Sequence, residues 1–146
     1  MAVVLRNNHR QFTINNAGWV TLLRLAWDYG WRPAGTTPPE HWIAPDDAAK
    51  AWSWNNADYV TGRGQRVSAS DARLLAEALE AILDDLPNHD PDATSGIRVY
   101  EAPGFPTVLY IAEDRQMTAF ERLGGRNKQG FAEFLAFCRG GSFTIW

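Results

Sequence analysis

Residues 68–86 read SASDARLLAEALEAILDDL and contain the clearest helical pattern in the chain. Ser68 is followed three residues later by Asp71, a spacing that predicts a capping box at a helix N-terminus. Apolar residues then recur at steps of three and four positions, the period of an amphipathic helix: Ala72, Leu75, Ala76, Leu79, Ile82, Leu83 and Leu86. We expect a helix that begins after Ser68 and packs one face against a core.

Two further helices are expected on either side of this segment. Residues 16–30 have Asn16 as a candidate N-cap and Gly30 as a candidate end. The apolar side chains assigned to the packed face of that helix are Trp19, Leu22, Leu23, Ala26 and Trp27. Residues 127–139 form the other predicted helix, which ends at a pair of glycines. The side chains expected to face the core are Phe131, Phe134, Leu135 and Cys138.

The remaining β-prone runs predict strands. Residues 2–5 and 11–14 predict an N-terminal hairpin or a strand and loop, residues 97–101 and 107–113 predict an antiparallel pair, and residues 142–146 predict a terminal strand. Residues 46–54 favour a short helix, and residues 58–64 a brief strand and turn. Because helices and strands do not alternate strictly, the prediction is an α+β fold. It is a single compact domain over residues 1–146, with about three main helices on a small, mainly antiparallel sheet.

Composition excludes several classes of protein. The 146 residues are 45% hydrophobic and 21% charged, which is ordinary for a globular chain. A formal net charge of -3 gives no general attraction to phosphate backbones or anionic lipid, so nucleic-acid binding is not expected. No run approaches the roughly 18 apolar residues of a membrane span, and the N-terminus turns polar too early for a signal peptide. We expect a cytoplasmic protein without membrane association.

The residues that most often carry catalysis are sparse. Cys138, the only cysteine, falls in the last turn of its predicted helix, where the helix dipole disfavours a thiolate, so a buried structural thiol is expected. The three histidines have no metal-binding spacing. His41 and Asp58 are the candidate general bases if the protein is an enzyme, but no nucleophile accompanies them. We predict no catalytic residue, cofactor or metal.

Two glycine loops precede predicted helices, whose unpaired N–H groups are natural anion sites. Residues 61–68 read TGRGQRVS, and residues 122–130 read RLGGRNKQG. Neither has the Walker spacing, and tight turns with exposed arginines are the alternative interpretation. The second loop is the more basic, so Arg126 and Lys128 are the candidate anion-contacting residues.

Tryptophan clustering is the least ordinary feature, because six of the seven tryptophans lie between positions 19 and 54. Tryptophan combines a broad apolar face with an N–H donor and suits both a core edge and a binding surface. The residues predicted to line a groove for a partner or ligand are Trp42, Trp52, Trp54, Asn55, Asn56, Asp58 and Tyr59. The alternative is a long loop fastened to the core by its aromatic side chains.

Three functions remain open from the sequence. The first is an interaction module of the immunity, antitoxin or adaptor kind, which binds a protein partner through the Trp-rich loop region. A protein encoded nearby is a candidate partner. The second is a small-molecule binder, for a nucleotide or a sugar, that uses the aromatic cluster and the basic glycine loop. A hydrolase or transferase ranks third.

Overall fold

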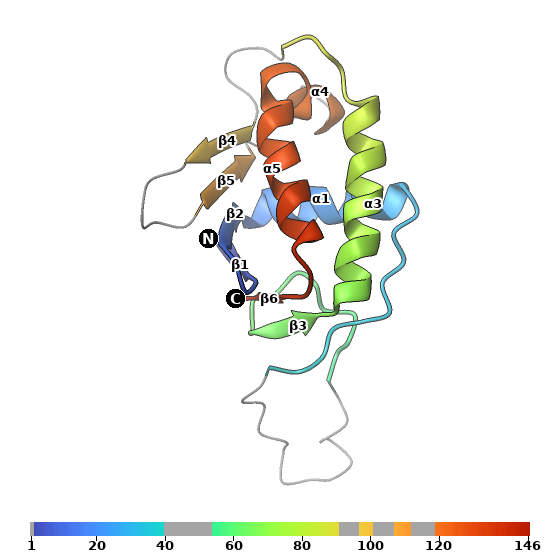
Figure 1. Ribbon diagram of the computed structural model, residues 1–146, viewed down its shortest axis with the longest axis vertical. Helices are drawn as coiled ribbons and strands as arrows, with labels where there is room; N and C mark the ends of the chain where they lie inside the picture. The colour runs from blue at the N-terminus through green and yellow to red at the C-terminus, as the bar shows by residue number, and fades with distance from the viewer. Residues whose placement is uncertain (1, 40–53, 91–96, 101–106, 112–118) are drawn as a thin grey trace, which may run out of the picture.

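The structure is a computed structural model that describes residues 2–39, 54–90, 97–100, 107–111 and 119–146 (Figure 1). Its strands are β1 (Ala2–Arg6), β2 (Gln11–Asn15), β3 (Gln65–Val67), β4 (Ile97–Tyr100), β5 (Thr107–Ile111) and β6 (Phe143–Ile145). Its helices are α1 (Asn16–Asp28), α3 (Ala69–Asp85), α4 (Ala119–Leu123) and α5 (Lys128–Arg139), with a 3-10 turn η1 (Gly125–Asn127).

The strands form one six-stranded sheet in the order β3-β6-β1-β2-β5-β4. The predicted antiparallel pair is present as β4 with β5, and the N-terminal runs form the hairpin alternative, β1 with β2. β6 also runs antiparallel to β1 and to β3, whereas β2 and β5 are parallel. The chain is thus a mixed α/β protein with a mainly antiparallel sheet, as the sequence predicts.

Aromatic side chains join the sheet to the helices. Phe12 of β2 lies 5.6 Å from Phe134 and 5.7 Å from Phe137 of α5, measured between ring centroids. Phe143 of β6 contacts Phe137 at 5.5 Å, and Trp19 of α1 meets Phe134 edge-on at 6.1 Å. All five rings are buried. Because these residues come from both ends of the chain, the core ties the N- and C-terminal segments together.

The helices pack as a layer in which α3 and α5 lie side by side and α1 crosses behind them (Figure 1). α1 ends at Asp28, and Gly30 follows with φ +94°, a left-handed conformation that glycine adopts without steric cost. α5 ends in the same way before Gly141, whose φ is +105°. The predicted glycine ends of both helices are confirmed.

Two local predictions need correction, and a third stays a prediction. Asn15, not Asn16, is the cap residue of α1, and its side chain makes no capping hydrogen bond. The strand predicted within residues 58–64 begins later, at Gln65, because residues 58–64 are held in turns by hydrogen bonds to the side chains of Asp58 and Gln65. The short helix expected at residues 46–54 lies almost wholly outside the described residues.

The capping box at α3 is half formed. Ser68 Oγ accepts a hydrogen bond from the backbone N–H of Asp71 at 3.1 Å, as predicted. The Asp71 carboxylate does not accept the reciprocal hydrogen bond from the backbone N–H of Ser68, because it accepts hydrogen bonds from other parts of the chain. The sequence therefore locates the start of α3 correctly and misplaces the partners of Asp71.

Replacing Ser68 with alanine should lower the free energy of unfolding by about 1 kcal/mol, because the N–H of Asp71 loses its acceptor. Urea denaturation followed by circular dichroism measures the change. Ser70→Ala, two residues later and exposed, is the matched control and should shift the free energy by less than about 0.5 kcal/mol. Equal losses in the two variants would show that the cap contributes nothing specific.

Candidate functional site

Two segments that are distant in sequence run together beside α3. The backbone N–H of Thr36 donates to the carbonyl of Asn56 at 2.7 Å, and the indole N–H of Trp54 donates to Thr36 Oγ1 at 3.1 Å. Thr37 continues the contact by pairing with Arg66 at the edge of β3. Residues 31–37 and 54–60 therefore form a joined pair of segments.

The buried carboxylate of Asp71 fastens both segments to the first turn of α3. It is only 2% exposed and accepts hydrogen bonds from the backbone N–H groups of Ala34 at 2.9 Å and Gly35 at 3.2 Å, and from the Tyr59 hydroxyl at 3.0 Å. The indole N–H of Trp31 donates to the Asp71 carbonyl at 3.2 Å. No ion pair to Asp71 occurs among the described residues. Neutral donors and the positive end of α3 stabilise its charge instead.

Tyr59 connects this carboxylate to the aromatic core. Its ring meets Trp31 edge-on at 5.1 Å, and its carbonyl accepts a hydrogen bond from the Trp19 indole N–H at 2.6 Å. Burial, the negative charge of Asp71 and the hydrogen bond to it all raise the pKa of Tyr59 above its ordinary value near 10. Tyr59 therefore stays protonated and remains a donor across the physiological pH range.

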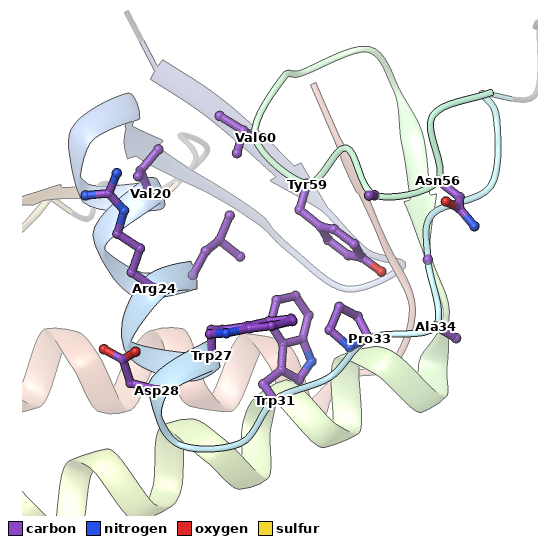
Figure 2. A pocket seen from close by; sticks show the side chains of 13 residues that line it. Val20, Arg24, Trp27, Asp28, Trp31, Pro33, Ala34, Asn56, Tyr59 and Val60 are labelled. Atoms are coloured by element: carbon purple, nitrogen blue, oxygen red, sulfur yellow. The ribbon is translucent and has the colours of Figure 1, made fainter. Parts of the chain in front are cut away.

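An apolar cavity of about 720 Å³ opens between α1 and the two segments (Figure 2). We call it the α1 groove. Its apolar lining comes chiefly from Val20, Leu23, Trp27, Trp31, Pro33, Tyr59 and Val60, and its polar lining from Arg24, Asp28 and Asn56. In Figure 2, Arg24 and Asp28 lie on the α1 side, and Tyr59 and Val60 lie across the groove. The groove is a preformed apolar depression with a few polar groups, the usual character of a binding site.

Trp27 is the most exposed aromatic side chain of the groove. It is 52% exposed, and Val60 across the groove is 51% exposed. The guanidinium of Arg32 lies over the Trp27 ring, 3.6 Å from its centroid. Arg32 Nη1 also donates to the carbonyls of Trp27 at 2.7 Å and Trp31 at 2.8 Å. A single arginine thus holds the indole in place from one side.

The assignment of Trp27 to the core together with Trp19 is wrong. Eight helical residues correspond to two turns and about 80° of further rotation, so the two side chains diverge around the helix axis. Trp19 is buried, whereas Trp27 faces the groove. Helical geometry therefore contains a signal that could have placed Trp27, together with Val20, Leu23 and Arg24, on a second face of α1.

The residues predicted to line a site are only partly brought together. Asn56 and Tyr59 line the α1 groove, although Tyr59 is buried. Trp54 joins the two segments through Thr36, which agrees with the alternative of a loop fastened by aromatic side chains. Asn55 Oδ1 accepts the N–H of Ala57 in a local turn. Trp42 and Trp52 lie outside the described residues, so their role stays a prediction.

The candidate bases are placed as follows. Asp58 Oδ1 accepts the N–H groups of Val60 at 3.1 Å and Thr61 at 2.9 Å, and Oδ2 lies 3.9 Å from Arg63 Nε. These contacts give Asp58 the role of a turn-stabilising residue. His41 lies outside the described residues.

The basic glycine loop already contacts a carboxylate of the same chain. The backbone N–H of Arg126 donates to Asp90 Oδ1 at 2.8 Å, and Lys128 Nζ donates to Asn88 Oδ1 at 2.7 Å. Asp90 therefore occupies one of the donors that an external anion would use. The Arg126 side chain is exposed.

Cys138 is fully buried, and burial raises the pKa of its thiol well above the ordinary value, as expected for a structural cysteine. Within the described ranges, no three His, Cys, Asp or Glu side chains gather in a way that could hold a metal ion. No helix in the described part of the chain is long and apolar enough to span a bilayer.

Comparison with protein-family models, curated proteins and solved structures gave no match to this chain. The function is therefore argued from the geometry of the α1 groove.

Tyr59→Phe should lower the free energy of unfolding by about 2 kcal/mol at neutral pH, because Asp71 loses a buried donor. It should also flatten the pH dependence above pH 10. In the wild type, unfolded Tyr59 releases its proton near pH 10 while folded Tyr59 retains it, so stability falls as the pH rises.

Urea denaturation at a series of pH values between about 7 and 11 measures both effects. Burial and the hydrogen bond to Asp85 raise the pKa of Tyr29 to about 12, but Tyr29 contributes equally to both proteins and cancels in the difference. An identical alkaline slope in wild type and variant would contradict the role given to the Tyr59 hydroxyl.

Proposed function

We propose that the protein is an interaction module that binds a protein partner through the α1 groove and the adjoining Trp-rich segments. The observation that carries this proposal is Trp27, which is half exposed beside an apolar cavity and held there by Arg32. The proposed kinds of module are immunity, antitoxin and adaptor proteins, and the proposed compartment is the cytoplasm.

The composition of the groove supports a protein partner. Tryptophan and arginine are enriched among the few interface residues that dominate binding energy, and such residues sit within an apolar centre surrounded by a polar rim. Trp27 and Val60 provide exposed apolar surface, and Arg24, Asp28 and Asn56 provide polar groups around it. A partner that covers this surface would remove a large indole from water without distorting the core.

A small-molecule ligand is the second candidate, and the size of the cavity favours it. About 720 Å³ lies within the range of roughly 300–1,000 Å³ typical of ligand pockets. The hydrolase or transferase alternative has less support, since the Asp58 carboxylate is committed to backbone N–H groups.

Trp27→Ala should abolish a partner complex that the wild type retains, while leaving the fold intact because the side chain is outside the core. Native mass spectrometry of the tagged protein, gently recovered from its own host, measures the complex. Trp146→Ala is a closely matched control: Trp146 is 44% exposed, also lies under an arginine (Arg6, 5.3 Å to the ring centroid), and does not line the α1 groove.

A second polypeptide that is lost in Trp27→Ala and kept in Trp146→Ala supports the proposal. If the partner persists in Trp27→Ala, the groove is not its binding surface. A small-mass adduct that depends on Trp27 would instead establish the second candidate.

A further inference from the structure

The two faces of the Trp27 ring are in different environments. Arg32 covers one face at 3.6 Å and is not among the residues that line the α1 groove. Trp27 does line the groove, and Figure 2 shows its indole extending from α1 into it. Trp27 therefore presents to the cavity a part of its ring that Arg32 does not cover.

Arg32 packs against the Trp27 ring before anything binds. Two backbone carbonyls hold Arg32 Nη1, so the guanidinium that covers the indole is itself positioned by the end of α1 and the residues that follow. A side chain that is ordered in the free protein loses little conformational entropy on binding. Trp27 thus offers a positioned apolar platform in the groove, whose apolar lining also includes Leu23 and, across from Trp27, Val60.

The Arg32 guanidinium influences which chemical groups bind favourably to the other face of the Trp27 ring. A guanidinium over an indole draws the π electron density toward itself. The opposite face becomes less attractive to a second cation and more suitable for the electron-rich face of another ring, since aromatic pairs stack in offset geometry. Flat, uncharged aromatic groups are favoured there over lysine and arginine side chains.

We propose that the partner inserts an uncharged aromatic side chain, tryptophan or tyrosine, into the α1 groove and stacks it on the cavity-facing side of Trp27. This inference rests on the proposed function and specifies the chemistry of its partner. Arg32 is the specificity-determining residue, because it both positions the indole and disfavours a cationic occupant.

The test is selection of peptides from a random displayed library on the full-length chain, with Trp27→Ala as the counter-selection and Trp146→Ala as the matched control. We expect the selected sequences to share a tryptophan or tyrosine at one position and to bind Trp146→Ala but not Trp27→Ala. Changing that aromatic residue to leucine in a synthetic peptide should weaken binding about threefold to tenfold, and changing it to arginine should weaken it further.

Arg32→Gln provides a readout that simple loss of the fold would not produce. Removing the Arg32 charge should weaken binding of the aromatic peptide. It should also reduce the difference in affinity between the aromatic peptide and its arginine version. Circular dichroism and urea denaturation verify that each variant is folded before binding is measured.

Selected peptides that are rich in arginine or lysine, that carry only aliphatic residues, or that bind Trp27→Ala as well as wild type would overturn the inference. The proposed function has its own test in the native complex. If that complex requires Trp27 while the selected peptides share no aromatic residue, the proposed function is supported and the inference of an aromatic occupant is wrong. If the native complex survives Trp27→Ala, both fail.

Discussion

The buried carboxylate of Asp71 is the constraint on which the arrangement of the molecule around the α1 groove depends. A charge that is 2% exposed must be compensated, and here the donors are two backbone N–H groups and a tyrosine hydroxyl from segments that flank residues 40–53. Neither segment forms a helix or a strand of its own along most of its length. The hydrogen bonds that the Asp71 carboxylate accepts therefore help to fix the positions of both segments relative to α3.

This arrangement explains how a groove can exist beside irregular backbone without collapsing. One wall is α1, which is anchored through Trp19 to the aromatic core. The other wall includes Tyr59, which is fixed at its hydroxyl by Asp71 and at its carbonyl by the Trp19 indole. Because Trp19 bonds directly to Tyr59, the two walls hold each other at a defined separation, and the cavity is preformed.

The sequence predicts those parts of the fold whose causes are local. Ser68, the apolar stripe after it and the glycines that end α1 and α5 act within a turn or two, so the helices and most strands follow from pattern. The partners of Asp71 are 12 residues away at Tyr59 and 36 and 37 away at Gly35 and Ala34, and no periodicity encodes such pairings. For the candidate site, two of the predicted binding residues, Asn56 and Tyr59, line the α1 groove, whereas the sequence prediction misses the α1 wall because it places Trp27 in the core.

The contrast between Trp19 and Trp27 gives the strongest reason to place function at the groove. Trp19 packs against Phe134 and bonds Tyr59, so folding requires it. Trp27 is half exposed and takes no part in the buried core, so folding depends on it less than on Trp19. Single exposed apolar residues are common on protein surfaces and by themselves signify nothing. Trp27 differs because an arginine packs over its ring and because it also lines an apolar cavity, an arrangement that suits binding more than stability.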